Sequence, residues 1–110
     1  MDLNTVIHDD GIYTFIADET VKIGTLVTFI SNCAVTACQK GERIAGLCLN
    51  ARDGYAAIKI SGLVQVNTVE KIEVGHRKLA AASDTEVALD DNGIEYLVIS
   101  SDDNTASILL

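Results

Sequence analysis

Few side chains in this sequence are of the types that ligate metals or act as nucleophiles. His8 and His76 are far apart, and each stands in a predicted turn among charged residues. Cys33 and Cys38 are separated by four residues, which is not the spacing of a zinc knuckle, and Cys48 follows later. We therefore expect no metal site and interpret the thiols as small buried hydrophobes.

The hydroxyl and carboxylate groups form no catalytic motif either. No serine lies in the G-x-S-x-G sequence of a nucleophile elbow, and no glycine-rich phosphate loop opens a helix. Neighbouring acids could act as acid and base or hold calcium, but each pair falls in a predicted turn, where aspartate accepts local backbone hydrogen bonds. These pairs are Asp9-Asp10, Asp18-Glu19, Asp90-Asp91 and Asp102-Asp103. We therefore expect no enzyme activity and no cofactor.

Composition limits the classes of partner. The chain has 110 residues, 48% of them hydrophobic, which predicts one folded domain. Sixteen acidic residues against 8 basic residues give a net charge of -8, which repels both a phosphate backbone and an anionic membrane. We expect neither as a partner. Because three cysteines cannot all pair and no secretory leader is recognised, we expect synthesis and folding in a cytoplasm.

The clearest local structure is a predicted β-hairpin over residues 44–66. Asp53-Gly54 supplies the positive φ of a tight turn between two runs of alternating character. If Asn50 faces Tyr55, then Leu49 faces Ala56, Leu47 faces Ile58 and Ala45 faces Ile60. That register places an apolar face on one side and directs Cys48, Ala57 and Lys59 to the other.

The remaining segments also predict short strands. β-formers fill 12–16, 25–30, 94–100 and 105–110, a strand is favoured at 86–89, and helix formers cluster only at 76–82, enough for one short helix. Residues 98–110 match residues 48–60 in apolar and polar character, which suggests an internal repeat of about 50 residues. We predict an all-β barrel or sandwich of short antiparallel strands, with an arm at 1–7 and a single domain at 8–110.

Several of these segments resemble a known family. The residues are Gly24–Val27 (GTLV), Gly41–Ala51 (GERIAGLCLNA), Ile58–Val66 (IKISGLVQV) and the closing Thr105–Leu110 (TASILL). Together they resemble the small capsid decoration, or cement, proteins of tailed bacteriophages and prophages. The resemblance covers the chain from about residue 20 to its end and rests on structural glycines and apolar alternation.

That resemblance implies a non-enzymatic structural protein on the virion capsid surface, made in the bacterial host cytoplasm. It implies the major capsid protein as partner, and a homo-oligomer, commonly a trimer, that staples neighbouring capsomers. Candidate interface residues are Val6 and Ile7 in the arm, and Leu63, Val64 and Val66, for which core burial is the competing interpretation. The alternative function is a small bacterial β-barrel module that binds a ligand or a protein.

Overall fold

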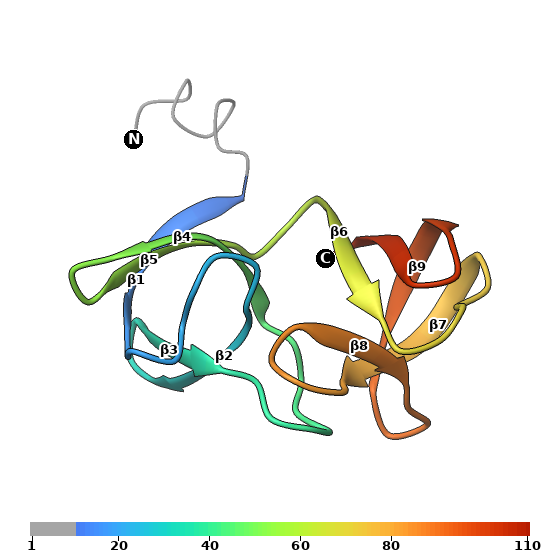
Figure 1. The fold of residues 1–110 in the computed structure, drawn as a ribbon, viewed down its shortest axis with the longest axis horizontal. Helices are drawn as coiled ribbons and strands as arrows, with labels where there is room; N and C mark the ends of the chain where they lie inside the picture. The colour runs from blue at the N-terminus through green and yellow to red at the C-terminus, as the bar shows by residue number, and fades with distance from the viewer. Residues whose placement is uncertain (1–10) are drawn as a thin grey trace.

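The computed structural model describes residues 11–110, which form ten strands and no helix. The strands close into two small barrels that lie side by side along the long axis of the molecule (Figure 1). Barrel 1 contains β1 (Ile12–Ala17), β2 (Leu26–Ser31), β3 (Ala34–Ala37), β4 (Gly46–Arg52) and β5 (Tyr55–Lys59). Barrel 2 contains β6 (Leu63–Thr68), β7 (Gly75–Ala81), β8 (Glu86–Leu89), β9 (Ile94–Ser101) and β10 (Thr105–Leu109). The all-β prediction is confirmed, and the predicted arm at 1–7 lies outside the described residues.

The two barrels repeat one topology. Their strand orders are β1-β3-β2-β4-β5 and β6-β8-β7-β9-β10, so each strand of barrel 1 has a counterpart in barrel 2. In both barrels the first and third strands pair in parallel, with Ile16 opposite Ala34 in barrel 1 and Asn67 opposite Glu86 in barrel 2. Antiparallel pairing of the first and fifth strands closes each barrel. The repeat of about 50 residues is therefore present, and each copy closes on itself.

The central hairpin exists, but the predicted register is wrong. Asp53 and Gly54 alone form the turn, with φ of 54° and 83°, so Arg52 faces Tyr55. Cys48 then faces Ile58, and a β-bulge leaves Leu49 without a partner. As a result Cys48 points into the core, whereas Leu49 is 39% exposed. The β9–β10 hairpin repeats the bulge, because Ser100 faces Ser107 and Val98 faces Ile108.

Residues 76–82, where composition allowed a short helix, instead belong largely to strand β7. This strand pairs with β8 on one side and β9 on the other. Leu79, Ala80 and Ala81 are buried there, so pairing and burial override the helix propensity of the alanines. None of the described residues forms a helix long and apolar enough to cross a membrane.

Each barrel has its own apolar core, built from matching positions. Val27, Val35 and Ile58 in barrel 1 correspond to Leu79, Val87 and Ile108 in barrel 2, and all six side chains are buried. The core of barrel 2 also includes Leu26, Cys38 and Ile44 from the first half of the chain. Apolar packing therefore joins the two barrels.

Candidate interaction surfaces

The junction between the barrels is made by residues 38–45, which connect β3 to β4. The Gly41 N–H donates to the Ala81 carbonyl at 2.8 Å, and the Ala81 N–H donates to the Glu42 carbonyl at 3.1 Å. This loop therefore adds to the edge of β7 as a short strand would. A further bond runs from the Leu26 N–H to the Asp84 carbonyl at 2.7 Å.

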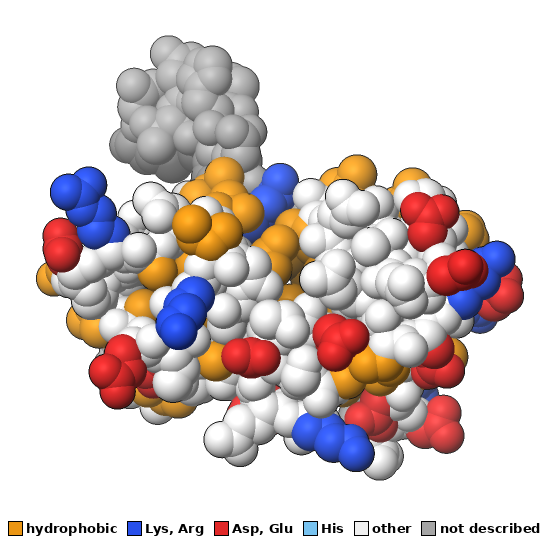
Figure 2. Space-filling model, viewed as in Figure 1, with side chains coloured by type: hydrophobic (Ala, Val, Ile, Leu, Met, Phe, Trp, Pro, Cys, Tyr) orange, Lys and Arg blue, Asp and Glu red, His pale blue; other side chains and the backbone are white. Residues whose placement is uncertain are grey.

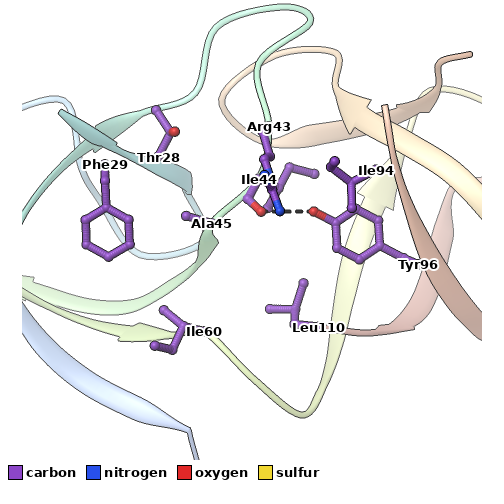
Figure 3. A pocket seen from close by; sticks show the side chains of 9 residues that line it. All are labelled: Thr28, Phe29, Arg43, Ile44, Ala45, Ile60, Ile94, Tyr96 and Leu110. Atoms are coloured by element: carbon purple, nitrogen blue, oxygen red, sulfur yellow. Dashed lines mark hydrogen bonds between the residues drawn. The ribbon is translucent and has the colours of Figure 1, made fainter. Parts of the chain in front are cut away.

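Tyr96 fixes the same junction from barrel 2. Its ring is buried, and its hydroxyl donates to the Ile44 carbonyl at 3.0 Å, as the dashed line in Figure 3 marks. Burial raises the pKa of this phenol, which keeps the hydroxyl protonated as a donor. Counted along the β4–β5 and β9–β10 hairpins, where Cys48 faces Ile58 as Val98 faces Ile108, the position of Tyr96 matches Gly46. A Cβ atom at Gly46 would lie 2.6 Å from Ile58 Cγ2. The same position thus carries a large anchor in one barrel and no side chain in the other.

Beside this contact lies a groove of about 440 Å³, which we call the inter-barrel groove. Its walls come from both barrels, as Figure 3 shows: Thr28, Phe29, Arg43, Ile44, Ala45 and Ile60 on one side, and Ile94, Tyr96 and Leu110 on the other. Arg43 carries the one charged side chain among these residues. Within residues 11–110 the single ion pair joins Arg52 to Asp53 at 3.5 Å, so no described carboxylate pairs with Arg43. The groove suits an apolar ligand or segment that carries an acid.

A second surface lies on the outer face of barrel 2. Leu63 in β6 faces Leu109 in β10, and Leu109 faces Leu97 in β9, so three leucines lie across three neighbouring strands. We call these residues the leucine patch. Leu63 is 51% exposed and Leu109 is 44% exposed. In barrel 1 the place of Leu109 is taken by Lys59, which faces Ile12 and Leu47.

Of the three candidate interface residues that the structure describes, only Leu63 is exposed. Leu63 lies in the leucine patch, whereas Val64 and Val66 are buried in the core of barrel 2. Val6 and Ile7 lie outside the described residues. Sequence reasoning missed Leu97 and Leu109, although alternation along 105–110 placed Leu109 on the face opposite Ile108. Only the strand order shows that Leu109 meets Leu63.

Apolar side chains are also common elsewhere on the surface. Fourteen large hydrophobic residues among those described are exposed. Figure 2 shows hydrophobic side chains gathered between the two halves of the molecule. At the end of barrel 1, the Phe15 and Phe29 rings meet edge to face with centroids 5.0 Å apart. Such surfaces bind other proteins or apolar ligands.

The titratable and nucleophilic side chains among the described residues are dispersed. Burial raises the pKa of Cys38 to about 12 and also raises that of Cys48, whereas Cys33 is exposed, contrary to the interpretation of all three thiols as buried. Asp18 accepts hydrogen bonds from the side chains of Thr20 and Thr36, which lower the pKa of its carboxyl. No group of three or more His, Cys, Asp or Glu side chains within residues 11–110 could hold a metal ion.

The inter-barrel groove and the leucine patch are therefore the two candidate interaction surfaces of residues 11–110. The residues of both surfaces are mainly apolar. Each surface is formed by residues from several strands or loops that lie apart in the sequence. No model of a known protein family matches this chain, and no curated protein is similar to it in sequence.

Proposed function

We propose that this protein is a non-enzymatic structural component of a tailed phage or prophage, which decorates the capsid and stabilises it. The observation that carries the proposal is the leucine patch, because neighbouring leucines on the face of a closed barrel, with Leu63 and Leu109 exposed and Leu97 half-buried, mark a surface for association. The family resemblance of residues 24–27, 41–51, 58–66 and 105–110 supplies the kind of partner, which is the major capsid protein.

The chemistry of the surface supports this kind of partner. The net charge of -8 disfavours nucleic acid and anionic membranes, so a protein surface is the natural target of the exposed apolar residues. Closed barrels offer few free strand edges, and association then depends on side-chain contacts. In the proposed assembly, the leucine patch packs against a neighbouring copy, and copies form a trimer on the shell.

The test is sedimentation of the purified chain with empty shells of the major capsid protein encoded in the same genome. The Leu109→Lys variant places in barrel 2 the residue that barrel 1 carries at the matching position, so we expect the variant to fold. We expect the natural chain to sediment with the shells and this variant to bind at least tenfold more weakly.

The matched control is Gln65→Lys, which adds the same charge to the same outer face of barrel 2 without removing a leucine. This control should bind as the natural chain does. Failure of the natural chain to sediment with the shells would overturn the proposed function. Equal binding by the Leu109→Lys variant would overturn the role of the leucine patch.

The inter-barrel groove favours a second candidate function, a small bacterial module that binds a ligand or a protein. Its volume of about 440 Å³ lies within the range of small-molecule sites, and its lining is mainly apolar with one charged group. The genes beside this one distinguish the two candidates. A neighbouring major capsid gene supports the decoration protein, and its absence supports the binding module.

A further inference from the structure

The inter-barrel groove has few polar groups, and they differ in what they can still bind. Among its nine lining residues, only Thr28, Arg43 and Tyr96 carry a polar side-chain group. The Tyr96 hydroxyl already donates to the Ile44 carbonyl at 3.0 Å. The single ion pair within residues 11–110 does not include Arg43, so its guanidinium has no described carboxylate partner. The groove therefore offers one cationic group to an incoming ligand.

The Arg43 charge stands among the apolar walls of the groove. Figure 3 shows Arg43 at the centre of the view, with Phe29 and Ile60 to one side and Ile94 and Tyr96 to the other. Burial raises the pKa of Tyr96, and the positive charge of Arg43 partly opposes this rise, so the guanidinium lies within electrostatic reach of the phenol. Because salt screens charges beyond about 10 Å, the net charge of -8 acts weakly on a single carboxylate in contact with Arg43.

The apolar walls come from both halves of the molecule. Phe29 and Ile60 belong to the half that forms barrel 1, and Ile94 and Leu110 belong to the half that forms barrel 2. Phe29 is exposed and the other three side chains are half-buried, so a ligand in the groove would remove apolar surface of all four from water. The edge-to-face contact with Phe15 orients the Phe29 ring.

The size of the groove distinguishes between kinds of occupant. Its volume of about 440 Å³ lies within the range of small-molecule sites. A protein–protein interface engages roughly 20–30 residues on each side, far more than the nine that line this groove. The dimensions therefore match a small molecule rather than a folded partner.

We propose that the inter-barrel groove binds a small monocarboxylate with an apolar body, such as a medium-chain fatty acid. The carboxylate pairs with the guanidinium of Arg43, whose planar fork matches the two carboxylate oxygens. The hydrocarbon lies against Phe29, Ile60 and Leu110. This inference rests on the groove that carries the second candidate function, and it is independent of the leucine patch and of the proposed decoration of a capsid.

Titration of the full chain with octanoate below its micelle concentration, followed residue by residue by NMR, tests this proposal. We expect saturable shifts of the amides of Thr28, Ala45 and Ile60, which line the groove. Arg43→Gln should weaken octanoate binding at least about tenfold, because it removes a charge-assisted hydrogen-bonded pair. The matched control is Arg52→Gln, which removes the same charge at the β4–β5 turn, outside the groove, and should bind octanoate as the natural chain does.

A second variant and a second probe keep the test independent of one substitution. Phe29→Glu changes an exposed residue of the groove wall, offers Arg43 a carboxylate of the chain itself, and should also weaken octanoate binding at least about tenfold. Octan-1-ol has the same hydrocarbon without the carboxylate. It should bind the natural chain at least about tenfold more weakly than octanoate, and Arg43→Gln should not change its affinity.

Three results would overturn the proposal: no saturable shift of the groove amides with octanoate, undiminished octanoate binding by Arg43→Gln, or octan-1-ol binding as tight as that of octanoate. Shifts confined to Leu63, Leu97 and Leu109 would assign octanoate to the leucine patch and would overturn it as well. Arg43→Gln should sediment with the capsid shells as the natural chain does, so failure of octanoate binding and failure of the decoration proposal are distinguishable.

Discussion

At the scale of residues, a side chain in one barrel can be compared with the residue at the matching position of the other barrel. Thr68 ends β6, and its hydroxyl is buried without a hydrogen-bond partner among the described atoms. Its counterpart in barrel 1 is Ala17, at the end of β1. The Thr68 N–H donates to the Asn104 carbonyl, and the Ala17 N–H donates to the Gly54 carbonyl in the matching turn. The hydroxyl of Thr68 is thus not required by the barrel, and its desolvation is uncompensated.

Replacing this hydroxyl by a methyl group should stabilise the protein. We expect Thr68→Val to raise the free energy of unfolding by about 1 kcal/mol, because the variant buries an apolar group in place of an unpaired polar one. Urea denaturation measures this change. The control is Thr25→Val, since the buried Thr25 hydroxyl accepts a hydrogen bond from the Lys22 N–H at 3.1 Å. This control should lower stability, and a loss of stability in Thr68→Val would contradict the interpretation.

The cysteines should differ sharply in reactivity. Burial raises the pKa of Cys38 from its ordinary 9.0 to about 12, so at neutral pH this thiol stays protonated, while Cys33 is exposed. Iodoacetamide should label Cys33 alone in the folded protein, and mass spectrometry of the peptides locates the label. Between pH 9 and 12 the folded state holds the Cys38 proton that the unfolded state has lost, so stability should fall as pH rises through this window. Equal labelling of Cys38 would show that the junction opens readily.

At the scale of elements, the hairpin tips carry the strongest local signals. The sequence predicts a polar turn over residues 51–54 with Asp53-Gly54 at positive φ, and both of these residues adopt positive φ. The register was not predictable in the same way, because the bulge at Leu49 breaks the alternation of the apolar face without leaving a glycine or proline to mark it. The strand β7 was also hidden, because His76 to Ala82 contains good helix formers, and only its pairing with β8 and β9 decides the outcome.

The turn at Gly54 offers a clean test of backbone strain. An added Cβ at Gly54 would meet no atom within 4 Å, so the effect of Gly54→Ala comes from the backbone, whose φ is +83°. We expect a loss of about 1–2 kcal/mol of unfolding free energy, the cost of a left-handed conformation for an L-residue. Thermal and urea denaturation measure this loss. Asp53→Gly should be tolerated, since φ is 54° there, and an unchanged stability in Gly54→Ala would contradict the turn conformation.

At the scale of the whole molecule, two copies of one barrel have been made different where they meet. Tyr96 of barrel 2 and the loop at 38–45 of the first half build the contact together, whereas Phe29, the counterpart of the buried Ala81, lines the inter-barrel groove. The all-β class and the period of about 50 residues were predictable from sequence. The closure of each copy into its own barrel, the groove and the leucine patch were not, because each depends on pairing between distant strands.

A protein that decorates a capsid changes the stability of the shell to which it binds. A protein that staples neighbouring capsomers must bind the assembled shell better than the dissociated subunits, and it therefore raises the stability of the shell by linkage. The most direct measurement is the temperature at which empty shells of the major capsid protein come apart, followed by light scattering with and without this protein. We predict a higher temperature with the natural chain and no increase with Leu109→Lys. An unchanged temperature with saturating natural chain would contradict the account.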